Sequence, residues 1–189
     1  FVDDADLEIA AEAIRAIHDL NIESAMPVVA ASMGREFPTE SLSDWLVLTR
    51  LINANFRVGD VASAERLLVA SVDADLPPKL RADALRALEE WPEPNVADAV
   101  LGNVRPLTGI RAEIAEIVRA QLPAILAESS GPLQAIAMRL ARDNDYPIPT
   151  DVLLGQVQNP ELDEEIREEA LTDLRNREEP ALAEVIRNT

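Results

Sequence analysis

The stretch that most constrains this chain runs from Asp60 to Trp91, where two amphipathic patterns follow each other almost without a connection. In the first, Asp60–Asp73, apolar residues recur three or four positions apart. The second, Pro77–Trp91, repeats that spacing and opens with two prolines, which the first turn of a helix tolerates. Only three residues separate the patterns, so the two helices must fold back on each other as an antiparallel hairpin.

The composition extends this helical interpretation to the whole chain. Hydrophobic residues make up 48% of the 189 residues, enough to bury a substantial core. Aromatic residues make up only 3%, which argues against a β-sandwich or barrel, because strands favour them. The sequence therefore predicts an all-α protein.

Three segments of the chain align on one another, beginning near Asp4, Asp75 and Glu161. Each places a branched apolar residue, an alanine and two further apolar residues at matching positions. The four sets of equivalent residues are Ile9, Leu80 and Ile166; Ala13, Ala84 and Ala170; Ile14, Leu85 and Leu171; and Ile17, Leu88 and Leu174. An alanine in the middle of an apolar face lets a neighbouring helix approach closely, so the alignment predicts stacked helices.

This pattern resembles the HEAT repeat, whose second helix is written apolar-Arg-x-x-Ala-apolar after an acidic turn. Leu80–Leu85 and Ile166–Leu171 fit it directly, whereas the first copy has Ala10 where the arginine belongs. The resemblance implies a right-handed α–α superhelix of about four to five helix pairs, with residues 1–189 forming a single repeat domain. We expect mid-helix prolines of the family type at Pro27 and Pro123.

Helix-ending and helix-starting signals divide the rest of the chain. We expect a first helix that ends at about Leu20 and a second over Ile22–Met33. A third helix should run from a cap at Thr39 or Ser41 to Phe56. Near the end of the chain we expect a helix over Leu133–Arg142, a rigid connector at 146–149 and then two or three further helices. Gly59-Asp60 should end one helix and start the next. Residues 91–108 look irregular apart from a short helix near Val96–Leu101, and a long helix should run from about Ile110 to Ser130. The chain begins without methionine, almost directly in what reads as a second helix of a pair, so we expect a piece of a longer protein.

The charge of the chain restricts its partners. The formal net charge is −18, and the basic residues are scattered, so the chain should repel nucleic acid and anionic membranes. There is no cysteine, which excludes thiolate metal sites and disulfides within these residues. No apolar run reaches the roughly 20 residues of a membrane-spanning helix. We expect no cofactor, no metal and no small-molecule site.

Several polar residues could carry chemistry, and each has a structural alternative that we favour. His18 lies late in a helix beside Asp19, where a helix-terminal cation fits better than a catalytic or metal role. An acidic cluster at residues 3–8 lacks the glycine and the glutamate of a calcium loop and suits a helix start. Asn53 and Asn55 should satisfy buried backbone groups. The acidic stretch 159–189 reads as a solvated face, with docking of a basic partner as the alternative.

The irregular segment 91–108 is the place where we expect contacts with a neighbouring domain. Long connections in repeat proteins either cover the core or contact a neighbour. Arg57, Arg105 and Arg111 lie on or near it and could pair with carboxylates of another domain. Trp45 and Trp91 are better suited to filling the core than to anchoring a partner, although Trp91 joins the three arginines as a possible interface residue.

A second resemblance concerns Arg50–Arg57, Leu80–Pro92 and Val104–Leu107. These stretches look like the helical middle region of large exported bacterial proteins. Those proteins join a sugar-dehydrogenase-type β-propeller, proposed to use pyrroloquinoline quinone, to a c-type cytochrome domain. This resemblance implies a periplasmic or exported setting and a part in positioning a substrate or redox partner. The residues themselves carry no catalytic signature. The function we expect is a non-catalytic scaffold that contacts neighbouring domains or another protein.

Overall fold

The computed structural model describes residues 1–107 and 110–183, which group into two compact units. The first unit is Phe1–Ile114, and the second is Ala115–Thr189. Within the described residues the secondary structure is helical, apart from one isolated β-bridge between Ala97 and Val104. The prediction of an all-α protein is confirmed. The boundary between the units follows the segment predicted to be irregular, and a single repeat domain over residues 1–189 stays a prediction.

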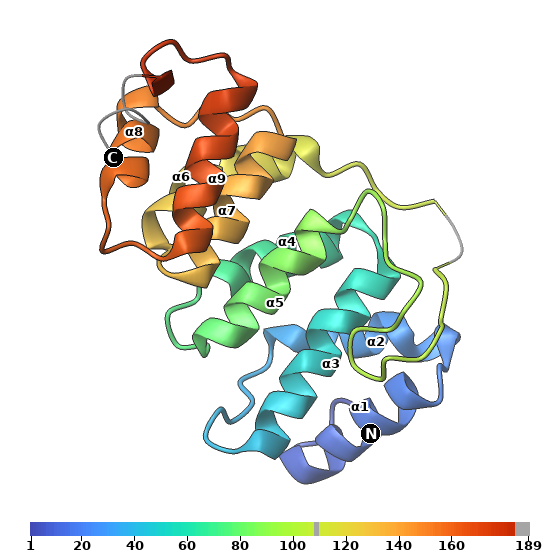
Figure 1. The fold of residues 1–189 in the computed structure, drawn as a ribbon. Coiled ribbons are helices and arrows are strands. Elements are labelled where there is room, and N and C mark those ends of the chain that lie inside the picture. The colour runs from blue at the N-terminus through green and yellow to red at the C-terminus, as the bar shows by residue number, and fades with distance from the viewer. Residues whose placement is uncertain (108–109, 184–189) are drawn as a thin grey trace. The chain divides into compact units, whose positions relative to one another are not determined.

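In its described residues the first unit contains five α-helices. They are α1 (Leu7–Asp19), α2 (Met26–Ala31), α3 (Leu42–Val58), α4 (Val61–Val72) and α5 (Pro78–Glu89), with short 3₁₀ turns at Glu23–Ala25 and Ser32–Gly34. The longest, α3, packs against α1, α2, α4 and α5, and α4 and α5 form the predicted hairpin (Figure 1). The side chains of α3 therefore reach every other helix of this unit.

The ends of these helices follow the sequence signals closely. Ser41 and Asp44 form a reciprocal capping box at the start of α3. Gly59 ends α3 in the left-handed conformation, at φ 72°, and Asp60 caps α4 by accepting from the Ser63 backbone amide. In place of the single helix expected over Ile22–Met33, the chain forms the short helix α2 with a 3₁₀ turn before it and another after it. Pro27 consequently lies in the first turn of α2, and its predicted mid-helix position is wrong.

The second unit contains four α-helices in its described residues. They are α6 (Ala115–Glu128), α7 (Pro132–Asp143), α8 (Thr150–Gln158) and α9 (Glu164–Asn176). Within this unit α7 packs against α6 and α9, and α8 packs against α9. Pro123 lies inside α6, as predicted. That helix begins five residues later than Ile110, whose side chain is fully exposed. The end of the chain after residue 183, where a further helix was expected, lies outside the described residues.

The aligned alanines are buried in two of the three copies. Helix α5 buries Leu80, Ala84 and Leu88, and α9 buries Ile166, Ala170 and Leu174, each at four-residue spacing. Helix α1 buries Ala10, Ile14 and His18 instead, and Ile9 is 45% exposed. The stripe in α1 is therefore shifted by one residue from the sequence alignment, which corresponds to about 100° of rotation around the helix. The polar His18 takes the place of the leucine that ends the stripe in α5 and α9.

The arginine of the repeat pattern makes the same bond in both copies that carry it. Arg81 of α5 donates its Nε to the carbonyl of Ser71, near the end of α4, at 3.0 Å. Arg167 of α9 donates its Nε to the carbonyl of Val157, near the end of α8, at 3.3 Å. In each case the acceptor lies ten residues before the arginine. Each bond satisfies one of the carbonyls that the end of a helix leaves without a partner.

Candidate interface

Residues 91–107 cross the surface of the first unit as a compact turn. The Asp98 amide donates to the Asn103 carbonyl, and the Arg105 amide donates to the Val96 carbonyl, both at 2.8 Å. The Asp98 carboxylate accepts from the backbone amides of Val100 and Leu101 at 2.9 Å each. The short helix predicted near Val96–Leu101 is wrong, because these bonds close a hairpin-like turn rather than a helical one. We call residues 91–107 the strap.

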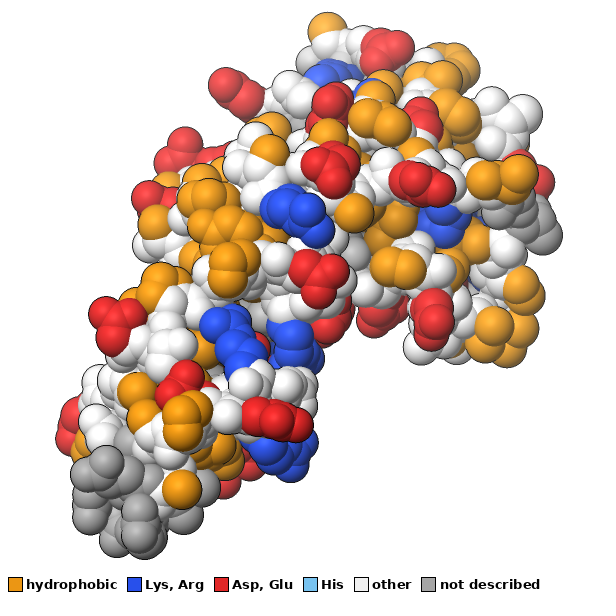
Figure 2. Space-filling view, turned by 90° about the horizontal axis from the view of Figure 1, so that it is seen from above, with side chains coloured by type: hydrophobic (Ala, Val, Ile, Leu, Met, Phe, Trp, Pro, Cys, Tyr) orange, Lys and Arg blue, Asp and Glu red, His pale blue; other side chains and the backbone are white. Residues whose placement is uncertain are grey.

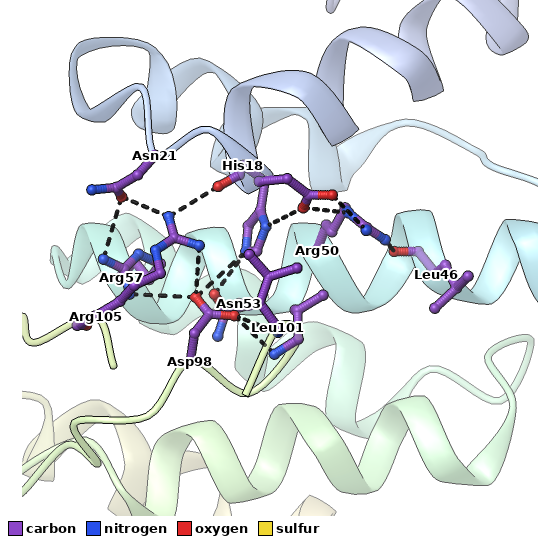
Figure 3. Close-up of polar contacts among 11 residues, drawn as sticks. His18, Asn21, Leu46, Arg50, Asn53, Arg57, Asp98, Leu101 and Arg105 are labelled. Carbon is purple, nitrogen blue, oxygen red and sulfur yellow. Dashed lines mark hydrogen bonds and ion pairs between the residues drawn. The ribbon is translucent and has the colours of Figure 1, made fainter. Parts of the chain in front are cut away.

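The strap is held down by a buried carboxylate (Figure 3). The Asp98 side chain is fully buried and lies 3.0 Å from Arg105 Nη1 and 3.5 Å from Arg57 Nη1. A buried carboxylate is tolerated only where charges and donors compensate for its lost water, and two arginines do so here. Burial, followed by the charge of Arg105, lowers the pKa of Arg57. Arg57 comes from α3, so this ion pair joins the strap to the central helix.

His18 lies against the same carboxylate from the side of α1. Its Nε2 is 2.8 Å from Asn53 Oδ1 and 4.0 Å from Asp98 Oδ2, and its Nδ1 is 3.0 Å from Asp19 Oδ1. Both ring nitrogens thus face oxygen atoms, and the side chain is completely buried. The predicted place late in α1 beside Asp19 is confirmed. Its role as a helix-terminal cation stays a prediction, and the ring is enclosed by α1, α3 and the strap.

Asp19 extends the cluster to the solvent edge. Its two carboxylate oxygens accept from Arg50 Nε and Nη2 at 2.9 and 2.8 Å. The Arg50 guanidinium, followed by the hydrogen bond from His18, holds the pKa of Asp19 below its ordinary value of 3.8. The cluster therefore runs from Asp19 at the end of α1, through α3, to Asp98 in the strap.

Arg105 joins the strap to the end of α1. Its Nη2 donates to the His18 carbonyl at 2.9 Å and to Asn21 Oδ1 at 2.6 Å (Figure 3). The Arg105 carbonyl in turn accepts from Arg57 Nη1 at 3.2 Å. Asn21 is positioned for this contact by a left-handed backbone, at φ 53°. The first of these bonds gives one of the last carbonyls of α1, that of His18, a side-chain donor.

Arg111 lies between two aromatic rings at the other end of the strap. Its guanidinium carbon is 4.1 Å from the Trp91 ring centroid and 4.5 Å from that of Phe56. It donates to the carbonyls of Phe56 and Trp91 at 2.7 and 2.9 Å, while Trp91 Nε1 donates to the Ala112 carbonyl. Burial lowers the pKa of Arg111 to about 10. The aromatic faces supply much of the compensation for this burial.

The structure thus brings together the four residues predicted as an interface, but within one unit. Arg57, Arg105 and Arg111 bond to groups of the first unit, and Trp91 is only 2% exposed. For Arg57 and Arg105 the carboxylate expected from another domain is supplied by Asp98 of the same segment, whereas Arg111 binds carbonyls and aromatic rings. Trp91 fills the core, as the favoured alternative predicted. Contact of this region with another domain stays a prediction, and His18, Asn53 and Asp98 are the members that the sequence did not connect.

The other polar candidates have structural roles. Asn55 donates its Nδ2 to the carbonyls of Ala30 and Leu51 at 3.0 and 2.8 Å, which confirms its predicted part in satisfying the backbone. Asn53 instead accepts through its Oδ1 from His18 Nε2. Asp6 caps α1, as expected of the acidic cluster at residues 3–8. Among the described residues, no group of three or more His, Cys, Asp or Glu side chains is placed to hold a metal ion.

On the face drawn in Figure 2, carboxylates lie among hydrophobic side chains and Lys or Arg side chains rather than gathered in one field. In α9, Glu169 pairs with Arg142 at 2.7 Å and with Arg139 at 3.2 Å, while Glu164 and Glu168 are exposed. Within the described part of the chain, no helix is both long enough and apolar enough to cross a bilayer.

Comparisons with known proteins yield no relative. No family model, no curated protein and no solved structure matches this chain.

Proposed function

We propose that this chain is a HEAT-like repeat scaffold whose surface contacts neighbouring domains or another protein. The observation that carries the proposal is the repeated bond from Arg81 and Arg167 to the end of the preceding helix. Alternate helices also pack on one another, α1 on α3, α3 on α5, and α7 on α9. Both features are expected of a stack of helix pairs, and our proposal is that this stack forms a right-handed superhelix of about four to five pairs.

The polar cluster supports a structural rather than a catalytic role. General acid–base chemistry needs a titratable group within hydrogen-bonding reach of a substrate. His18 and Asp98 are fully buried side chains whose polar atoms face partners of the same unit. Their contacts seat the strap on α1 and α3. We therefore propose no enzymatic activity for this chain itself.

Hydrogen–deuterium exchange tests the scaffold role. The chain is measured alone and within the full translation product of its gene. We expect a continuous set of surface amides to exchange more slowly in the larger context, while the buried core exchanges at the same rate in both. If the two exchange maps coincide and no other protein added at micromolar concentration alters them, the scaffold role is wrong.

The second candidate is an accessory part of an exported quinone-dependent dehydrogenase and cytochrome c assembly. The observation that favours it is that all three stretches carrying that resemblance meet in the first unit. The Phe56 and Trp91 rings make an edge contact at 6.3 Å, and Arg57 donates to the Arg105 carbonyl. In this role the chain positions a substrate or a redox partner in a periplasmic setting.

The two candidates are separated by the residues that flank this chain in its gene. A Cys-x-x-Cys-His motif downstream and a repeat of short strands upstream would support the redox assembly. Flanks that lack both would leave the general scaffold as the function.

A further inference from the structure

The first unit has an open groove between α1 and the first half of α3. Its volume is about 590 Å³, and Phe37 and Pro38 of the α2–α3 connection also line it. From α1 it receives Leu7, Ala11 and Arg15, which lie on one face at four-residue spacing. From α3 it receives Val47 and Arg50 together with Leu46 and Asp44. The lined length is about two helical turns on each side.

The floor of the groove is apolar and partly open to solvent. Leu7, Phe37 and Val47 are half-buried, and Leu46 is 47% exposed. A leucine left this open gains free energy when an apolar side chain covers it, and the floor offers several such contacts side by side. An occupant that supplies apolar side chains along about two turns would fit this floor.

The charges around the groove favour a basic partner. The two arginines in its lining are already bound, Arg15 to Glu12 at 2.9 Å and Arg50 to Asp19 at 2.8 Å. Neither arginine pairs with the carboxylates of Glu8 and Asp44, although the Asp44 carboxylate also accepts from the Ser41 backbone amide in the capping box of α3. A second copy of this chain would bring a formal net charge of −18 to an acidic rim, which disfavours it as the occupant.

We propose that this groove binds a basic amphipathic segment of a partner protein, seated as a helix with its apolar face on Leu46 and Val47. Its Lys or Arg side chains then lie against Glu8 and Asp44. Helices laid into hydrophobic grooves commonly present anchors one turn apart, which matches the spacing of the floor. This inference rests on the proposed scaffold role and names the chemistry of the partner.

The test uses a synthetic helical peptide of about 14 residues, with leucines on one face and lysines elsewhere. Its affinity for the 189-residue chain is measured by calorimetry in about 0.15 M salt, where long-range attraction is largely screened. The groove variant is Leu46→Lys with Glu8→Lys. The matched control, Val152→Lys with Glu168→Lys, changes the charge equally in the second unit, and Val152 is 45% exposed. Circular dichroism verifies that both variants fold.

We expect the groove variant to bind the peptide about tenfold more weakly, and the control to stay within about twofold of the parent chain. A peptide with glutamine in place of leucine should show the same affinity for the parent chain, the groove variant and the control variant. Equal weakening by both variants, or no binding by the parent chain, overturns the inference. If the exchange experiment above nevertheless reveals a protected surface away from α1 and α3, the scaffold role stands and only the groove inference is lost.

Discussion

At the scale of single residues, Asp98 has the largest consequence for the first unit. Its carboxylate is the only one among the described contacts to join Arg57, Arg105 and the His18 ring, and its second oxygen orders the strap itself. Removal of one partner from a buried ion pair leaves the other charge without compensation. The strap and the helices beneath it are therefore coupled through one side chain.

We expect Asp98→Asn to lower the free energy of unfolding of the first unit by about 3 kcal/mol, because Arg105 stays buried without its counter-charge. Urea denaturation followed by tryptophan fluorescence measures this loss. The control is Asp83→Asn, which removes a carboxylate bound to Lys79 and Arg86 at the surface and should cost less than about 1 kcal/mol. Equal losses for the two variants would contradict a central role for Asp98.

Asp19 should make the stability of the first unit sensitive to acid. Arg50 holds the pKa of Asp19 below 3.8, so its folded state loses the proton more readily than the unfolded chain does. The resulting stabilisation is complete above the unfolded pKa and is lost as the pH falls through the folded one. Asp19→Asn should therefore be less stable than the parent chain at pH 7, with a difference that shrinks below about pH 4. Urea midpoints between these pH values measure this difference, and a constant difference would contradict the account.

At the scale of helices, the sequence predicted the helix ends that depend on neighbouring residues. Gly59-Asp60 marked the junction of α3 and α4, and Ser41 marked the start of α3, because capping involves side chains within a few residues. The predicted helix near Val96–Leu101 failed for a related reason. The Asp98 carboxylate does accept from the backbone amides that follow it, as a helix cap would. Gly102, at φ 69°, then reverses the chain, so that the Asn103 carbonyl accepts from the Asp98 amide.

The sequence predicted the arginines of the candidate interface but not the groups that they bind. Arg57, Arg105 and Arg111 were noticed because they are charged residues near an irregular segment. Their partners could not be found in this way, since His18 is 35 residues from Asn53, and Arg105 is 87 residues from the carbonyl it binds. The one-residue shift of the buried stripe in α1 was equally hidden, because Ile9 and Ala10 are both apolar and only packing decides between them.

The junction between α3 and α4 should tolerate glycine alone. A Cβ on Gly59 would lie 3.1 Å from Arg111 Nη1, and φ 72° is unfavourable for other residues. We expect Gly59→Ala to lower the free energy of unfolding by about 1–2 kcal/mol, as measured by thermal denaturation. Gly34→Ala is the control, because nothing lies within 4 Å of its Cβ position and its φ is not positive. A similar loss at both glycines would count against this account.

At the scale of the whole molecule, each unit has a core of its own. Leu51, Leu67 and Leu85 are fully buried in the first unit, and Leu122, Leu140 and Leu174 are fully buried in the second. Both tryptophans, Trp45 and Trp91, belong to the first unit. Tryptophan fluorescence therefore reports on the first unit, whereas far-ultraviolet circular dichroism reports on the helices of both.

We expect Leu174→Ala to destabilise the second unit by about 3 kcal/mol, because it leaves a cavity at a fully buried position. The circular dichroism signal should then be lost in part at a lower temperature, with the fluorescence transition moving less. Leu171→Ala, at a position 36% exposed one turn earlier in α9, should change either transition only slightly. Identical shifts of both signals would show that the cores do not unfold separately.

The twin bonds of Arg81 and Arg167 also bear on how such a chain can change over generations. Each guanidinium donates to a main-chain carbonyl, which every amino acid offers, so serine in one copy and valine in the other serve equally well as acceptor. The contact therefore constrains the donor residue and not the acceptor residue. A helix pair of the proposed repeat could change at the acceptor position without losing this bond, and the arginine is the residue by which more diverged copies would be traced.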